Sequence, residues 1–124
     1  MSAADTYELT IDQARDWTWG IQWLVGKTER TAVPKPGIED YTILMGFKEN
    51  YSDLTPLVLL TAGDGITVTA DGWIRFHMLA AVCETLPAKR LKFEVVAISP
   101  ALAVPPNFQS SLAKGTAIIV PKVV

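Results

Sequence analysis

The sequence predicts an all-β fold: an antiparallel β-sandwich of seven or eight short strands, with one short helix near residues 79–85. Many segments alternate apolar and polar side chains with a period of two, which is typical of strands with one buried face. Eight glycines and eight prolines are spread between these segments and supply turns. Alternating strand–helix units are absent, so the pattern favours a β-sandwich or small barrel over a parallel α/β sheet.

The 124 residues fit a single domain, 1–124, with its own core. Hydrophobic residues make up 49% and charged residues 19%, as in a globular protein. The net charge of -2 gives no excess of cations for nucleic-acid binding, and no segment approaches the ~20 apolar residues of a membrane span. Cys83 is the single cysteine, so an internal disulfide is impossible. The N-terminus lacks the pattern of a signal peptide, and we expect synthesis in a reducing cytoplasm.

The first half of the chain contains four predicted strands. Residues 7–12 and 17–23 each carry apolar side chains at odd positions. A polar, proline-bearing loop is predicted over 28–40. Tyr41, Ile43, Met45 and Phe47 then share one face of a strand, and after a turn at 49–56 the run "LVLLT" predicts a short apolar strand.

Residues 65–78, "GITVTADGWIRFHM", predict a hairpin whose register follows from its buried face. A three-residue loop, 70–72, places Val68 opposite Ile74 and Ile66 opposite Phe76, so that one face is wholly apolar. A two-residue loop would mix apolar and polar side chains on both faces, so the three-residue loop is preferred. Gly72 can supply the positive φ that such loops commonly require.

The second half contains the predicted helix, which Pro87 ends, and two further strands. Residues 90–99 place Leu91, Phe93, Val95 and Ala97 on one face, while Val96 and Ile98 make the far end apolar on both faces. Residues 100–115 are predicted to form a loop, and 116–124 the closing strand.

The segment "DWTWGIQWL" raises the question of whether its indoles form a binding platform or a core. Trp17, Trp19, Ile21 and Trp23 share one face and together amount to more than ~600 Å² of apolar surface, at or beyond the largest patch that a typical monomer exposes. We therefore expect at least two of the three indoles to be buried, and one ring to lie at the rim. The predicted core comprises Trp17, Trp19, Ile21, Trp23, Ile43, Met45, Phe47, Ile66, Val68, Ile74, Phe76, Leu91, Phe93 and Val95.

The sequence contains no recognisable catalytic or metal-binding constellation. His77 is the single histidine, and Cys83 lies in an apolar stretch that predicts a buried structural thiol. Asp64 and Asp71 each precede a glycine and fit ordinary turns better than calcium loops. We predict no catalytic residues, no metal and no cofactor.

The hairpin register places Trp73 on the polar face beside Arg75 and His77. An exposed tryptophan beside an arginine is typical of protein interfaces. The apolar strand ends, with Ile118 and Val120, and the proline-bearing loops 31–38 and 100–107 are further candidate contact regions.

Several blocks of the sequence match a known pattern in order and spacing. They are Thr10–Gln13, Asp64–Ile66, Asp71–Ile74, Leu79–Pro87 and Gly115–Val120. Together they resemble a widespread group of small bacteriophage tail or structural proteins, similar to the N-terminal domain of phage baseplate upper proteins. The chain departs from the group at Ala14, where glycine is usual, and at Lys89 and Leu91, where glycine and tyrosine are usual.

The resemblance implies an immunoglobulin-like sandwich that acts as a noncatalytic structural component of a virion. The expected location is the tail, the baseplate or the capsid surface, after synthesis in the host cytoplasm. The expected partners are other virion proteins, with the chain present in many copies or as a homo-oligomer. The alternative is a carbohydrate-binding module that uses exposed tryptophans, for example on a host-surface sugar.

Overall fold

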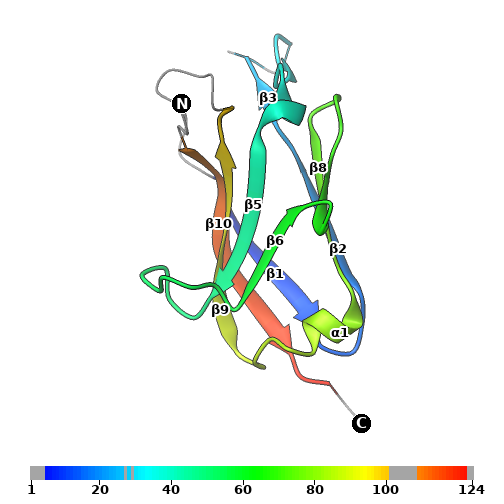
Figure 1. The fold of residues 1–124 in the computed structure, drawn as a ribbon, viewed down its shortest axis with the longest axis vertical. Helices are drawn as coiled ribbons and strands as arrows, with labels where there is room; N and C mark the ends of the chain where they lie inside the picture. The colour runs from blue at the N-terminus through cyan, green and yellow to red at the C-terminus, as the bar shows by residue number, and fades with distance from the viewer. Residues whose placement is uncertain (1–4, 27, 29, 101–108, 123–124) are drawn as a thin grey trace.

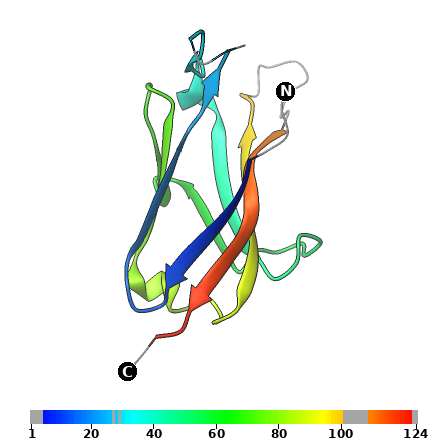
Figure 2. The same cartoon turned by 180° about the vertical axis from the view of Figure 1, so that it is seen from behind.

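The computed structural model describes residues 5–26, 28, 30–100 and 109–122. Strands account for most of this part of the chain (Figures 1 and 2). They are β1 (Asp5–Asp12), β2 (Trp17–Gln22), β3 (Leu24–Val25), β4 (Val33–Pro34), β5 (Thr42–Lys48), β6 (Val58–Ala62), β7 (Gly65–Val68), β8 (Trp73–Met78), β9 (Arg90–Ile98) and β10 (Gln109–Val120). A short helix, α1 (Ala80–Cys83), and a 3-10 turn (Ile38–Asp40) complete the described elements.

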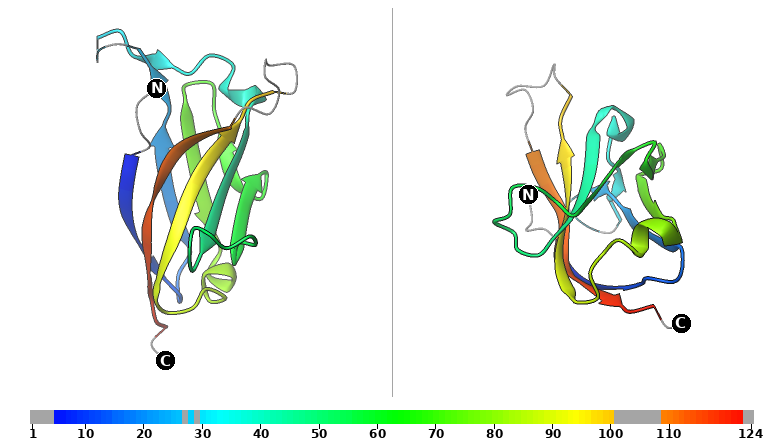
Figure 3. Two further views of the ribbon diagram at one scale, coloured as in Figure 1. Left: turned by 90° about the vertical axis from the view of Figure 1, so that its left-hand side faces the viewer. Right: turned by 60° about the horizontal axis from the view of Figure 1, so that its bottom comes forward.

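The strands form a two-layered sandwich, which confirms the predicted fold class. One layer has the order β1-β10-β9-β5-β6 and the other the order β7-β8-β2. Strand β6 pairs with β5 on one side and β7 on the other, so it joins the layers along one edge (Figure 3). The immunoglobulin strands B, C, D, E, F and G correspond in order to β2, β5, β7, β8, β9 and β10. One layer then contains strands B, E and D and the other contains strands C, F and G, as in that fold. Strand β6 adds to the C strand as C′ does in variable-type domains.

Two strand pairings are parallel, although the sequence predicted an antiparallel sandwich throughout. Strand β1 pairs with β10 from Asp5 opposite Ala113 to Asp12 opposite Val120. Strand β6 pairs with β7 over two positions. The remaining pairings between described strands are antiparallel. Side-chain alternation shows which residues share a face, but it carries no information on strand direction.

The β7–β8 hairpin has the predicted register. Ile66 lies opposite Phe76 and Val68 opposite Ile74. Thr69 and Trp73 close the three-residue loop, and the Gly72 amide donates to the Thr69 carbonyl at 3.0 Å. Gly72 has a φ of 90°, which glycine adopts without strain.

Two predicted loops contain structure that the sequence pattern did not indicate. Within 28–40, residues 33–34 pair with β3, and Ile38 is buried at the 3-10 turn. Strand β10 begins at Gln109, inside the predicted loop 100–115. The sequence did not indicate this part of the strand, because Leu112 is the one large apolar side chain in its first half. The predicted contact loop 100–107 falls mostly on residues 101–108, which lie outside the described part of the chain.

The tryptophan row of β2 faces the interior. Trp17 is 8% exposed, whereas Trp19, Ile21 and Trp23 are partly buried and pack against the core, as does Val68. Trp23 is the ring at the rim, where it contacts Tyr41 edge-on at 5.2 Å and the Lys35 ammonium at 5.4 Å. The other predicted core residues are fully enclosed: Ile43, Met45, Phe47, Ile66, Ile74, Phe76, Leu91, Phe93 and Val95.

Aromatic rings join the two layers at the centre of the sandwich. Trp19 of β2 contacts Phe93 of β9 edge-on at 5.8 Å and stacks on Phe76 at 5.3 Å. Tyr7 of β1 meets Trp19 edge-on at 5.2 Å. In antibody domains a disulfide links strands B and F, to which β2 and β9 correspond. This cluster of Tyr7, Trp19, Phe76 and Phe93, the aromatic seam, connects the same two strands here.

Cys83 takes no part in linking the layers. It is buried on α1, and its sulfur lies 3.9 Å from the Met78 carbonyl oxygen. Burial raises the pKa of its thiol, and the nearby Asp16 carboxylate acts in the same direction. Leu79, the first residue of the predicted helix 79–85, is 56% exposed and precedes α1, which begins at Ala80.

Candidate functional site

The outer face of the larger layer carries a mixed apolar and basic surface. Along β5, β9 and β10, one set of alternate side chains enters the core, so the other set points outward. The outward set lines a groove with the loop that follows β5. Its lining residues are Leu44, Gly46, Lys48, Tyr51, Pro56, Leu59, Lys92, Glu94, Val96 and Lys114, together with Phe93, whose side chain is buried in the core; this is hereafter the lysine groove.

The loop 49–57 forms one wall of the lysine groove by folding back over the sheet. The Leu57 amide donates to the Phe47 carbonyl at 2.7 Å, and the Tyr51 hydroxyl donates to the Gly115 carbonyl of β10 at 3.1 Å. The loop packs closely over β5 here, because a Cβ at Gly46 would be in ordinary van der Waals contact with the Pro56 Cβ, at 3.5 Å. The loop is therefore anchored at β5 and again at β10.

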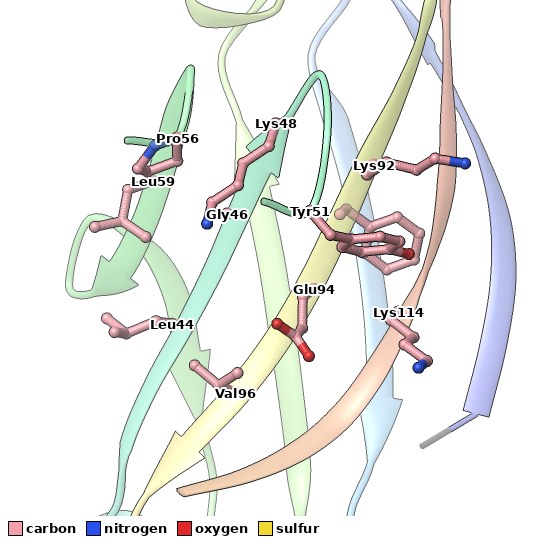
Figure 4. Close-up of a pocket in the computed structure, with 11 residues that line it drawn as sticks. Leu44, Gly46, Lys48, Tyr51, Pro56, Leu59, Lys92, Glu94, Val96 and Lys114 are labelled. Carbon is pink, nitrogen blue, oxygen red and sulfur yellow. The ribbon is translucent and has the colours of Figure 1, made fainter. Parts of the chain in front are cut away.

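The lysine groove has a volume of about 510 Å³, in the range of ligand sites. In Figure 4, Pro56 and Leu59 lie on one side and Tyr51 and Lys114 on the other. Leu44 lies below Leu59 on the same side with Val96 next to it, and Lys48 and Glu94 lie between the two sides. The groove thus combines apolar and charged side chains, a mixture that protein-binding surfaces also show.

The charged groups of the lysine groove are predominantly cationic. Lys48, Lys92 and Lys114 face a single carboxylate, Glu94, whose oxygen accepts a hydrogen bond from the Ser111 hydroxyl at 2.8 Å. Among the described residues, no carboxylate lies within 4.0 Å of these three ammonium groups. The Lys92 ammonium lies 6.0 Å from the Tyr51 ring. The groove is therefore locally positive on a chain whose net charge is -2.

Exposed apolar side chains concentrate beside the lysine groove. Tyr51 is 48% exposed, Leu54 97%, Leu57 49% and Leu59 46%. These four, all within residues 51–59, are more than half of the large hydrophobic side chains exposed in the described part of the chain. Tyr51 and Leu59 line the groove, and Leu54 and Leu57 belong to the loop that forms its wall. Scattered exposed leucines need no explanation, but this grouping within residues 51–59 makes the surface a candidate contact region.

The Tyr51 hydroxyl gives a pH-dependent test of the loop anchor. Burial raises the pKa of this phenol above 10.0, and the Glu94 charge adds to the effect. The corresponding stability is fully present below the unfolded pKa and is lost as pH rises through the folded value. Tyr51→Phe should lower the free energy of unfolding by about 1 kcal/mol at neutral pH and flatten its decline above pH 10.

Denaturant unfolding across this pH range measures both effects. Tyr41→Phe is the control, because no hydrogen bond of the Tyr41 hydroxyl is found among the described residues. Equal losses in the two variants would contradict the anchor.

The predicted contact residues lie on two different surfaces. Trp73, Arg75 and His77 project from the outer face of β8, in the opposite layer from the lysine groove. Ile118 and Val120 lie half-buried on β10, beyond Lys114 in the layer of the groove. The structure therefore does not bring these five residues into one site.

The surface around Trp73 is a shallow depression of about 470 Å³. The Arg75 guanidinium lies 5.4 Å from the Trp73 ring and donates to the Thr69 hydroxyl at 3.4 Å. His77 lies 3.7 Å from the Asp16 carboxylate. The depression is lined by Thr18, Trp19, Gly20, Thr67, Trp73, Arg75, Phe76 and His77, hereafter the Trp73 patch.

The lysine groove was not predicted from the sequence. One signal was present, because Val96 makes β9 apolar on its outer face as well as its inner one. The other contributors are Lys48, Lys92 and Lys114, which are far apart in sequence, and a loop that folds back over β5. Only the strand order brings them together.

The aspartates considered for calcium occupy turns. The Thr61 amide donates to the Asp64 carbonyl at 3.1 Å, and the Asp71 carboxylate accepts the Thr69 hydroxyl, which lowers the pKa of Asp71. The described residues contain no cluster of three or more histidine, cysteine, aspartate or glutamate side chains arranged for a metal ion. Nor do they include a helix of the length and apolar character needed to span a membrane.

Solved structures that are similar to this chain include an insect protein. No protein-family model and no curated protein matches the chain. The crystal structure of hemolin, an insect immune protein discussed for homophilic adhesion, aligns with 98% of this chain at 21% sequence identity and a TM-score of 0.44. The aligned region is 26% of the hemolin chain, so this chain spans about a quarter of its length.

Proposed function

We propose that the protein is a noncatalytic structural component of a bacteriophage virion that docks onto other virion proteins through its lysine groove. The observation that carries the docking role is the group of exposed apolar side chains at 51–59, next to a groove lined by apolar and basic residues. Such a surface suits protein contact, because it combines apolar side chains with charged ones.

The virion assignment is supported by the sequence blocks that resemble phage tail and structural proteins. Asp64–Ile66 and Asp71–Ile74 form the turns that flank β7, and Gly115–Val120 forms the second half of β10. These blocks are turns and strands that build the sandwich, which is what a family defined by a scaffold rather than by chemistry would share. The tail, the baseplate and the capsid surface all remain within the proposal.

Quantitative mass spectrometry of purified phage particles tests this proposal. We expect the chain at many copies per particle, in fixed ratio to the major capsid protein. A chain with the substitution Val96→Glu, which places a charge in the lysine groove, should be depleted from particles. A Thr67→Glu copy on the opposite layer should be incorporated normally. A chain found in infected cells but absent from particles would overturn the assignment.

Carbohydrate binding at the Trp73 patch is the second candidate function. The observation in its favour is a half-exposed indole lying over Gly20, whose Cβ would be 3.7 Å from the ring, among hydroxyls of Thr18 and Thr67. Sugar rings stack on such indole faces. Binding to a glycan array that is lost in Trp73→Ala would support this function. If no glycan on the array binds the unmodified chain, the function is contradicted.

A further inference from the structure

We infer that two copies of this chain associate through their lysine grooves, with loop 49–57 of each copy entering the groove of the other and Leu54 as the anchor. This inference rests on the proposed docking role of the groove and names its partner as a second copy. It is argued from the loop, from the groove and from their relative placement.

The loop presents an apolar anchor next to a carboxylate. Leu54 is 97% exposed, the most exposed of the large hydrophobic side chains described. Loop residues 49–57 include Glu49 and Asp53 and no cation. Glu49 is paired with Lys89, and Asp53 accepts the Asn50 amide at 3.1 Å, which leaves the Asp53 carboxylate beside Leu54 with capacity for a cation.

The lysine groove matches that loop in both apolar character and charge. Leu44 and Val96 in its lining offer apolar contact for a leucine side chain, and its volume of about 510 Å³ exceeds what one side chain occupies. Three lysines against one glutamate give the groove a surplus of positive charge. An acidic loop with an apolar tip is therefore the complementary occupant.

The loop and the groove lie on the same face, which permits a two-fold arrangement. In a dimer with two-fold symmetry, the same patch of each copy contacts the other, so one rotation seats both loops at once. The second insertion is then intramolecular and adds to the strength of the first. Two insertions also cover the leucines at 57 and 59, which are about half exposed in a single copy.

Sedimentation velocity over micromolar to millimolar concentrations tests the inference. The unmodified chain should show a concentration-dependent shift from monomer to dimer that weakens as salt rises. Leu54→Asp should raise the dimer dissociation constant at least ~30-fold, as expected for a central apolar anchor. Leu79→Asp makes the same change at a leucine 56% exposed, outside the groove, and should leave the dissociation constant unchanged.

Mixing two variants distinguishes insertion of the loop into the groove from nonspecific association. Leu54→Asp leaves the groove intact, and Val96→Glu leaves the loop intact, so each variant alone should remain monomeric. Their mixture should form a heterodimer with one loop seated in one groove, weaker than the unmodified dimer. Unchanged unfolding midpoints establish that both variants are folded.

A monomer at every concentration, equal effects of Leu54→Asp and Leu79→Asp, or a mixture that does not associate would each overturn self-association. The docking role is tested separately, by the amount of the Val96→Glu chain in purified particles. If Val96→Glu is depleted from particles while the unmodified chain is monomeric, the groove binds another virion protein instead of a second copy.

Discussion

Replacing Gly115 with alanine is expected to lower the free energy of unfolding by at least ~3 kcal/mol. Gly115 has a φ of 152°, and a Cβ there would lie 1.9 Å from the Tyr7 carbonyl oxygen. Backbone in sparsely populated regions costs ~1–3 kcal/mol for residues with a side chain. Here β1 must also move away from β10, which breaks the parallel ladder between them.

Gly63→Ala is the matched control for this variant. Gly63 has a φ of 80° but no heavy atom within 4 Å of its ideal Cβ, so alanine there should cost only ~1–2 kcal/mol. Denaturant unfolding of both variants isolates the contribution of the close approach between β1 and β10. Similar losses in the two variants would show that the strands separate readily at this point.

Truncation of Trp19 to alanine should cost ~3–5 kcal/mol in unfolding free energy. The ring contacts Tyr7, Trp17, Phe76 and Phe93, with centroids 5.2–6.3 Å away. Removing it opens a cavity between the two layers and deletes ring pairs worth ~0.5–1.5 kcal/mol each beyond their buried area. We also expect the near-ultraviolet circular dichroism of the remaining aromatic residues to weaken.

Trp73→Ala removes the same side chain from the outer face of β8. Because Trp73 is half-buried on the sheet surface, its loss should cost less than ~1.5 kcal/mol. Thermal and denaturant unfolding of the two variants, compared in parallel, measure the difference. If both variants lose equal stability, the aromatic seam is not the main connection between the layers.

The sequence predicted which side chains are buried more successfully than how the strands are connected. The β7–β8 register followed from matching apolar faces, because a shift by one residue would have exposed Ile66 and Phe76. The inward direction of Trp17 followed from the size of the apolar surface on its face. Both inferences depend only on neighbours along the chain or across one short turn.

The remaining features depend on contacts between distant segments. The parallel β1–β10 pairing joins the first and last of the described strands, and no local pattern specifies strand direction. The first half of β10 is polar and resembles a loop, but it pairs with β9 from Gln109 onward. The lysine groove was missed for the same reason, since Tyr51, in the loop after β5, reaches Gly115 of β10 across β9.

The aromatic seam also determines where the stability of this domain originates. A disulfide between these strands would act largely on the denatured chain, by restricting the conformations open to it. Rings in contact restrict nothing once the chain has unfolded, so their whole contribution belongs to the native state. That contribution comes from apolar burial, which carries a large heat capacity and weakens on cooling. The free energy holding the two layers together should therefore fall towards low temperature, and reducing agents should leave it unaltered.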